Sequence, residues 1–373
     1  MSIDELAQKV GQRNKPAPIG EWETAATAIS IPVRKLELIA ESTRAPFGML
    51  FLDEPPSEPI PISDFRRFAN NSNTRPSLNL LETIYEYQRR QDWLSEQLQE
   101  EGEPSLVFIG SVTIHTDILT VARDIRETLR IGTEERQQNR NNSSSVLWMK
   151  TRLEESGITV VRKGYAGTAT KRLLNRAEFK GFALADQYAP YIFVNGKDWP
   201  ASQIFTIAHE CVHLWLGESA IPGGEWNSES AIPMERFCNK VAAEVLVPAK
   251  ELVEIWIKSV SDIENIRNSA AHFKVSSLAT LICSRNSDLI SRSSFDRTWK
   301  QLAADFESRD ARVRKSGGGD YYNNAGVHLG KRFIREVLTR TMEGRTLYNE
   351  AFELLGTRKT SVLLQMAEKF LQE

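Results

Sequence analysis

The feature that most constrains the fold is the pattern His209-Glu210-x-x-His213, which lies inside an apolar, helix-compatible run. In an α-helix, residues four positions apart share one face and lie about 6 Å apart, so both histidines can direct a ring nitrogen at one tetrahedral zinc ion. Glu210 lies about 100° round the helix from His209, where its carboxylate can act as a general base on water instead of binding the metal. The helix is predicted to end at Gly217.

Apolar residues surround this pattern on nearly all sides of the helix, which predicts that the helix is buried. They are Ile204, Phe205, Ile207, Ala208, Val212, Leu214 and Leu216. Two histidines and a glutamate are costly to bury unless they are paired or bound to a metal. A metal site is therefore favoured over a pair of histidines that only pack in the core or lie at the surface.

A third ligand is expected downstream, because a catalytic zinc site keeps three protein ligands and one open position. The best candidate is Glu235, in a second helical run that Pro248 ends. Glu235, Asn239 and Ala242 share one face of this helix, so a carboxylate would lie beside small side chains that let two helices approach closely. Glu244 follows nine residues after Glu235 and is expected to point away from that face.

Two other groups of candidate ligands remain open. Glu225 and Glu229 lie in a predicted loop that contains glycine and serine, and they could reach the metal in principle. Cys211 and Cys238 flank the proposed ligands and could bind a soft metal, although Cys211 lies about 200° from the face of the histidines. For the cysteines, a small buried apolar role is the favoured interpretation.

Four stretches of this region resemble one bacterial and phage family, the ImmA/IrrE metallo-endopeptidases. They are Gly181-Phe-Ala-Leu-Ala-Asp186, Ile192-Phe-Val-Asn195, Phe205-Thr-Ile-Ala-His-Glu210 and Glu235-Arg-Phe-Cys-Asn-Lys-Val-Ala-Ala-Glu-Val-Leu-Val-Pro248. The resemblance implies that His209, His213 and Glu235 hold Zn²⁺ and that Glu210 is the general base. It also implies a protein substrate, a regulator of repressor or antitoxin type encoded nearby, whose cleavage releases a stress, phage or mobile-element response.

Length and composition narrow the class of protein. The chain has 373 residues, of which 41% are apolar and 26% are charged, as in a soluble globular protein of two or three domains. A formal net charge of −2 excludes a global positive field that would attract nucleic acid or an anionic membrane. The three cysteines form no C-x-x-C pair, which fits a reducing compartment. We see no signal-like start and no apolar stretch of about 18 residues, so we expect a cytoplasmic protein without a membrane span.

The periodicity of the chain predicts an α+β fold that is mostly helical, with strands at 158–162, 179–185 and 191–194. The predicted domains are a degenerate helix-turn-helix-like unit at 1–62, a helical connecting region at 63–145, a small-sheet zincin-like peptidase domain at 146–257 and a helical C-terminal domain at 258–373. The last begins with a helix-turn-helix-like pair that needs no DNA to explain it. The strand beside the metal is expected to be an open edge strand, to which an extended peptide can pair.

Four further residues are candidates for supporting the ligands or contacting substrate: Asn239, Tyr188, Tyr191 and Asn195. The two tyrosines could donate to the oxyanion of a tetrahedral intermediate, although a packing role is favoured for each. The stretch 316–324 is rich in glycine but lacks the Gly-Lys-Ser/Thr ending of a phosphate-binding loop, and no role follows from its sequence.

Residues 1–62 resemble the Xre-type helix-turn-helix that is often fused to this peptidase family. The resemblance lies in a Leu-Ala-x-x-Val rhythm, the pair Trp22-Glu23 and the stretch from Ala45 to Pro56. The usual first helix is missing, and prolines at 16 and 18 stand where a recognition helix should start. A structural or partner-binding role is therefore favoured over DNA reading.

The sequence leaves two alternative functions open. A DNA-binding regulator or antitoxin would bind an operator through the N-terminal helices and keep the metal domain as a scaffold, but the incomplete helix-turn-helix and the acidic charge balance disfavour it. A zinc-dependent hydrolase of a small molecule would use the same ligands, and the expected open edge strand disfavours that function.

Overall fold

The computed structural model divides into two compact units, Met1–Ile60 and Pro61–Glu373. It describes residues 6–7, 10, 19, 22, 30–43, 45–54, 76–138, 142–198, 200–219, 233–310 and 321–372. The predicted boundary at residue 62 and the glycines of the stretch 316–324 lie outside these residues. The predicted boundaries at 145 and 257 fall within the second unit, and they remain proposals for its subdivision.

In the first unit, the structure describes helix α3 (Val33–Thr43) and the short 3-10 helix η1 (Phe47–Phe51). A small core forms around the buried residues Ala7, Val10 and Ile19, against which side chains of α3 pack. The prolines at 16 and 18 lie outside the described residues. The degenerate helix-turn-helix of this unit, and the structural or partner-binding role favoured for it, therefore remain predictions.

The second unit is mostly helical and contains one three-stranded sheet among its described residues, so the predicted α+β fold is confirmed. Its helices are α5 (Leu78–Glu100), α6 (Ile118–Leu129), α7 (Thr133–Gln137), α8 (Asn142–Glu155), α9 (Pro200–Leu216), α10 (Pro233–Leu246), α11 (Ala249–Ile255), α12 (Asp262–Phe273), α13 (Ser277–Asn286), α14 (Arg292–Asp310), α15 (Tyr321–Leu329), α16 (Lys331–Met342), α17 (Tyr348–Leu355) and α18 (Thr360–Leu371). None of the described helices is long and apolar enough to cross a membrane.

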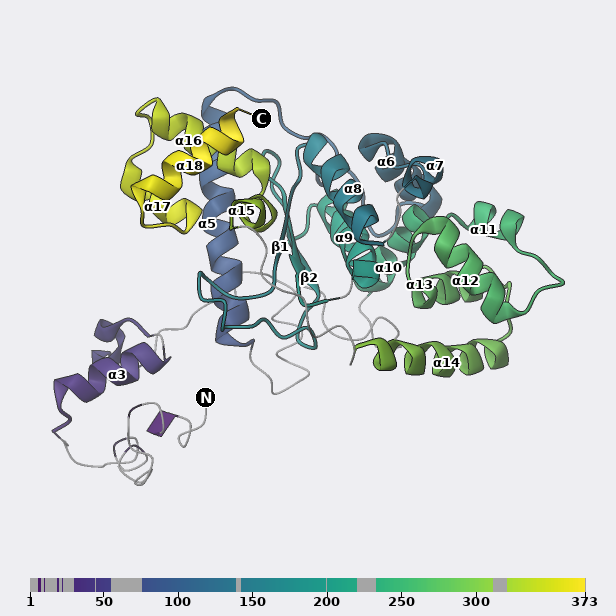
Figure 1. The fold of residues 1–373 in the computed structure, drawn as a ribbon, viewed down its shortest axis with the longest axis horizontal. Coiled ribbons are helices and arrows are strands. Elements are labelled where there is room, and N and C mark those ends of the chain that lie inside the picture. Colours follow the sequence, from purple (N-terminus) through teal and green to yellow (C-terminus); the bar gives the residue numbers. More distant parts are fainter. Residues whose placement is uncertain are drawn as a thin grey trace. The chain divides into compact units, whose positions relative to one another are not determined.

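The three strands are β1 (Thr159–Lys163), β2 (Gly181–Leu184) and β3 (Tyr191–Asn195), close to the predicted ranges. Their order in the sheet is β1-β3-β2, with β1 parallel and β2 antiparallel to the central strand β3. Helices cover both faces of the sheet: α5 and α15 lie on one side, and α8 and α9 on the other (Figure 1). Strands covered on both faces read as continuous apolar runs, which explains why these segments show little alternation.

Alternate residues of the strands enter two different cores. Val160 and Ile192 pair across β1 and β3 and join the core formed with α8 and α9. On the other face, the rings of Phe182 and Phe193 stack with centroids 4.7 Å apart, and Phe193 also contacts Tyr87 of α5 at 5.1 Å. The sheet is thus the layer that separates α9, the helix of His209 and His213, from the long helix α5.

The C-terminal helices complete the α5 side of the sheet. Phe333 of α16 is fully buried, and its ring contacts those of Trp93 in α5 and Tyr191 in β3. The turn before α16 lies directly on β1, because a Cβ atom at Gly330 would stand 2.4 Å from Cγ2 of Thr159. Gly330 also has a φ of +85°, a conformation that favours glycine. The C-terminal helices are therefore part of the same core as the sheet.

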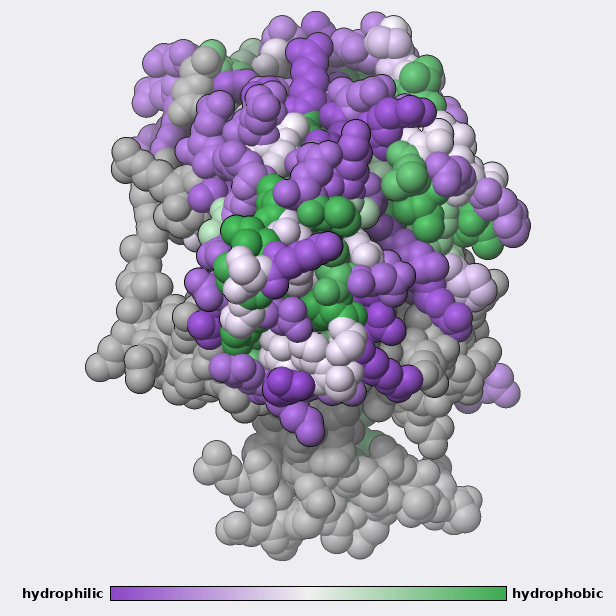
Figure 2. Space-filling view, turned by 90° about the vertical axis from the view of Figure 1, so that its right-hand side faces the viewer, coloured by the Kyte–Doolittle hydropathy of each residue, from purple (hydrophilic) through white to green (hydrophobic). Residues whose placement is uncertain are grey.

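The pair α12 and α13 has the connectivity predicted as helix-turn-helix-like, with Lys274 in the left-handed conformation between the two helices. Half of the residues of α13 are buried, because it packs against α12 and α14 and also contacts α10 and α11. The face of the unit that carries α11–α14 is mainly hydrophilic, with small groups of apolar residues between (Figure 2).

Candidate metal centre

Helix α9 carries the two histidines, and its sequence explains its buried position. Its apolar residues, predicted to surround the pattern, pack in the central core of the unit. The helix ends at Leu216, directly before Gly217, as predicted. Gly217 has a φ of +71°, and a Cβ atom there would meet Cα of Gly110 at 2.9 Å, so this close approach requires glycine.

Helix α10 crosses α9 and brings a carboxylate to the histidines. Nε2 of His209 lies 3.1 Å from Nε2 of His213 and 3.2 Å from Oε2 of Glu235. Nε2 of His213 lies 3.4 Å from Oε1 of Glu235. Among the described residues, these three side chains form the group of histidine, cysteine and acidic residues that could hold a metal ion. The structure therefore brings together the three predicted ligands.

The spacing of these donor atoms matches that expected around a small tetrahedral ion. Bonds of about 2.0–2.1 Å place neighbouring donors of a tetrahedral zinc ion about 3.3 Å apart. The three observed separations fall on either side of that value. Two imidazole nitrogens and one carboxylate oxygen are also a donor set used by catalytic zinc sites. The residues present therefore fit the metal that the motif predicts.

The protonation states expected at this site suit metal binding. Burial acts to raise the pKa of Glu235, but hydrogen bonds from His209 and His213 outweigh it and hold that pKa far below its usual range. Burial lowers the pKa of His213. An ionised carboxylate and a neutral imidazole are the forms that bind a metal ion, because bound protons would compete with it.

Glu210 is fully buried next to the three ligands but is not one of them. Neither of its carboxylate oxygens has a hydrogen-bond partner among the described residues. Burial, together with the nearby charge of Glu235, raises the pKa of Glu210 well above its usual value. A buried carboxylate without partners is costly. Its place beside the ligand cluster is the one that a general base acting on water requires.

A second layer of contacts orients the histidine rings, and both partners come from α10. Nδ1 of His209 lies 3.0 Å from Oδ1 of Asn239, the residue that shares a helix face with Glu235. Nδ1 of His213 lies 3.8 Å from Sγ of Cys238. Partners of this kind fix the tautomer and the orientation of a metal-binding histidine. The shared face of Asn239 was visible in the sequence, whereas the contact of Cys238 was not.

The other residues predicted near the site lie elsewhere. Tyr188 lies in the turn between β2 and β3, where its backbone N–H donates to Asp186, and it lines a surface cavity of about 400 Å³. Tyr191 is buried on the α5 side of the sheet, away from α9. Asn195 stabilises the end of β3, because its Nδ2 donates to the carbonyl of Phe179. For the tyrosines, these positions fit the packing role that the sequence favoured.

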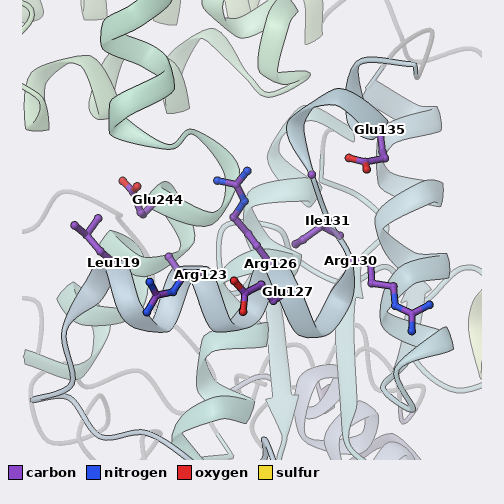
Figure 3. A pocket seen from close by; sticks show the side chains of 10 residues that line it. Leu119, Arg123, Arg126, Glu127, Arg130, Ile131, Glu135 and Glu244 are labelled. Carbon is purple, nitrogen blue, oxygen red and sulfur yellow. The ribbon is translucent and has the colours of Figure 1, made fainter.

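Glu225, Glu229, Glu244 and the cysteines were the other candidates for a metal ligand. Glu225 and Glu229 lie outside the described residues. Glu244 points away from the cluster, as expected: it lines a cavity of about 420 Å³ together with Arg126 of α6 (Figure 3). Its Oε2 accepts a hydrogen bond from the backbone N–H of Ala249. Cys211 is buried in the core, where burial raises the pKa of its thiol.

Gly181 lies at the start of β2, close to Glu210. It begins one of the stretches that resemble the family, but no role was predicted for it. A Cβ atom there would stand 2.6 Å from Cγ2 of Thr206, 2.7 Å from the carbonyl oxygen of Phe193 and 3.2 Å from Oε1 of Glu210. The strand can therefore lie against Glu210 only because this residue has no side chain.

Gly181→Ala is accordingly expected to displace β2 or the Glu210 side chain and to lower stability by about 1–3 kcal/mol, the usual cost of overpacking. Thermal denaturation and turnover of the variant measure the effect. Gly48→Ala is the control, because a Cβ atom at Gly48 meets nothing within 4 Å. Unchanged stability and turnover in Gly181→Ala would show that this close contact has no consequence.

Comparison with known families agrees with this geometry. Residues 153–282 match the family model described as the IrrE N-terminal-like domain, Peptidase_M78. The fold and the site thus define a domain of the metallopeptidase type. Residues 153–282 therefore match the family that the resemblance implied. Residues 329–369 match a domain of unknown function, DUF8813. No curated protein and no solved structure matches the chain.

Proposed function

We propose that this protein is a zinc-dependent endopeptidase that cleaves a partner regulatory protein, of repressor or antitoxin type, in a stress, phage or mobile-element response. The observation that carries the proposal is the convergence of His209, His213 and Glu235 within one buried cluster, beside the unpartnered carboxylate of Glu210. The family of residues 153–282 supports peptide hydrolysis. The regulatory context comes from the resemblance to ImmA/IrrE proteins.

Each of the four side chains has a distinct role in this proposal. His209, His213 and Glu235 would hold the zinc ion, which when bound acts as a Lewis acid toward the carbonyl of the peptide. A carboxylate oxygen of Glu210 takes a proton from the attacking water and then delivers it to the nitrogen of the leaving amine. Burial raises the pKa of Glu210, which makes its carboxylate a stronger base toward the proton of the water.

The substrate is proposed to be an extended segment of a protein that pairs with β2. This strand is at the edge of the described sheet and packs on the metal helix α9. The expectation of an open edge needs correction, because all four residues of β2 are buried. At the end of the strand, the backbone N–H of Ala185 already donates to Oγ of Ser219. Pairing with a peptide therefore requires that this edge first be uncovered.

We place the reaction in the cytoplasm. Cys211, Cys238 and Cys283 are all free and buried, and no pair of them forms a disulfide. Free thiols in every cysteine position fit a reducing compartment.

Co-expression with the product of the neighbouring gene tests the proposal. The expected result is one cleavage of that product by the wild-type chain and none by Glu210→Gln or His213→Ala. The position of the cut is read from the masses of the two fragments. Cleavage that persists in both variants would mean that another protease made the cut, and an intact product beside the zinc-loaded wild-type chain would exclude that partner as the substrate.

A further inference from the structure

We propose that Cys238 is a positioning residue for the metal ligand His213, and that its thiol sets how tightly the site holds its metal. The contact that carries this inference joins Sγ of Cys238 to Nδ1 of His213. The inference rests on the metal site of the proposed function, but it does not depend on which substrate is cleaved or on cleavage itself.

The sequence of α10 places three functional side chains on one face of that helix. Glu235, Cys238 and Asn239 are separated by three and four positions, so they form one stripe along the helix. Glu235 points its carboxylate at Nε2 of both histidines. The next two members of the stripe reach behind the rings, Asn239 to His209 and Cys238 to His213. One short helical segment therefore supplies a ligand and an orienting partner for each of the other two ligands.

The direction of these hydrogen bonds follows from the position of the metal cluster. Nε2 of each histidine faces the other ligands, so a bound metal takes the lone pair of Nε2 and leaves the proton on Nδ1. For His209, that proton meets an amide oxygen, which is a strong acceptor. For His213, it meets a thiol sulfur, which is a weak acceptor, at the longer distance of 3.8 Å. The two histidines are thus held with unequal strength.

Burial increases the free-energy cost of losing the weak contact between Cys238 and His213. His213 and Cys238 are both fully buried, so water does not replace the sulfur atom if it is removed. Among the described residues, the structure shows no other partner for Nδ1 of His213 than Cys238. Loss of the sulfur would leave a buried N–H group without an acceptor, which costs more than the weak hydrogen bond itself. The imidazole ring of His213 could then rotate, and the bond between its Nε2 and the metal would weaken.

The same geometry argues that Cys238 supports a ligand and does not bind the metal itself. Its sulfur contacts the nitrogen of the imidazole ring that faces away from the cluster. Cys238 is absent from the group of donor atoms that converge, which consists of His209, His213 and Glu235. The alternative that Cys238 is a soft metal ligand is therefore disfavoured by the position of its sulfur.

The test compares zinc affinity in three variants of the full chain by competition with a coloured chelator. Cys238→Ala is expected to bind zinc about 10–100-fold more weakly than the wild type, the usual effect of removing an orienting partner. Cys238→Ser, which keeps an acceptor, is expected to recover part of that loss. Cys211→Ala is the matched control, because it removes an equally buried thiol for which the described residues show no hydrogen bond to His209, His213 or Glu235. Equal zinc affinity in Cys238→Ala and the wild type would overturn the proposal.

A spectroscopic readout separates a positioning role from direct coordination. The cobalt-loaded wild-type chain is expected to lack the near-ultraviolet charge-transfer absorption of a thiolate bound to cobalt, and its visible bands should shift in Cys238→Ala but not in Cys211→Ala. A thiolate band that disappears in Cys238→Ala would make Cys238 a ligand and overturn the positioning role.

These measurements also distinguish this inference from the proposed function. A wild-type chain that binds zinc but cleaves no partner would contradict the endopeptidase and leave the role of Cys238 intact. A wild-type chain that binds no zinc would overturn both. Should Cys238→Ala fail to fold, Cys238→Ser decides the question, because its hydroxyl still accepts but lies farther from Nδ1 than the sulfur does. Zinc binding weaker than in the wild type supports the positioning role, and wild-type affinity overturns it.

Discussion

Glu210→Gln is expected to lower turnover about 10²- to 10⁴-fold while the metal stays bound, the range typical for loss of a general acid–base group. The amide keeps the shape of the side chain but cannot accept the proton of the attacking water. Among the described residues, Glu210 is not one of the donors that converge on the candidate metal site, so its replacement should leave zinc content unchanged. Cleavage assays and metal analysis on the same preparation measure both quantities.

The fold of this variant is expected to be intact, because an amide is cheaper to bury than a carboxylate that has no partner. Thermal denaturation of the metal-free proteins checks this point, with wild-type stability or better as the expected result. A Glu210→Gln chain that cleaves its partner normally, beside an inactive His213→Ala chain, would show that Glu210 is not the general base. The partner should remain bound to the inactive variant, which makes it useful for capturing the substrate.

The ligands were predictable from the sequence because their geometry is local to single helices. His209 and His213 are four residues apart, and the apolar residues around them predict a buried helix. Glu235 required one further step, the choice among carboxylates of a second helix by the face they share with small residues. The structure brings these three side chains together and directs Glu244 elsewhere. Helical periodicity was sufficient for this part of the site.

Contacts between elements that are distant in sequence were not predictable in the same way. The periodicity of α10 places Cys238 near the stripe of Glu235, but which ring nitrogen it meets depends on how α10 crosses α9. The requirement for glycine at position 181 depends on how closely β2 approaches Thr206 and Glu210. The edge strand β2 was expected to be open, yet its residues are buried. Its exposure depends on elements distant in sequence that pack on it, such as α9.

The C-terminal region shows the same limit on a larger scale. Residues 329–369, which match a domain of unknown function, were predicted from the sequence only as part of a helical C-terminal domain at 258–373. In the structure, Phe333 packs on Tyr191 of the central strand, and Gly330 approaches Thr159 of β1. These helices therefore cover the face of the sheet opposite the metal helix. Helix α9 packs on the other face of the same sheet, so the C-terminal helices and the candidate metal site share this sheet.

Glu235→Ala is expected to abolish stable zinc binding, whereas Glu244→Ala should keep about one zinc ion per chain, as a site with three protein ligands predicts. Removal of Glu235 leaves two imidazole nitrogens and no negative charge to neutralise the ion. Glu244 belongs to the same helix but lines a cavity on its other side with Arg126, so its loss removes no ligand (Figure 3).

Metal content is measured by elemental analysis after dialysis against a chelator, with His213→Ala as the reference for a lost ligand. Zinc that is retained in Glu235→Ala and lost in Glu244→Ala would move the third ligand to the opposite face of α10. Loss in both would point to a general weakening of the helix, which the thermal stability of the two variants would reveal.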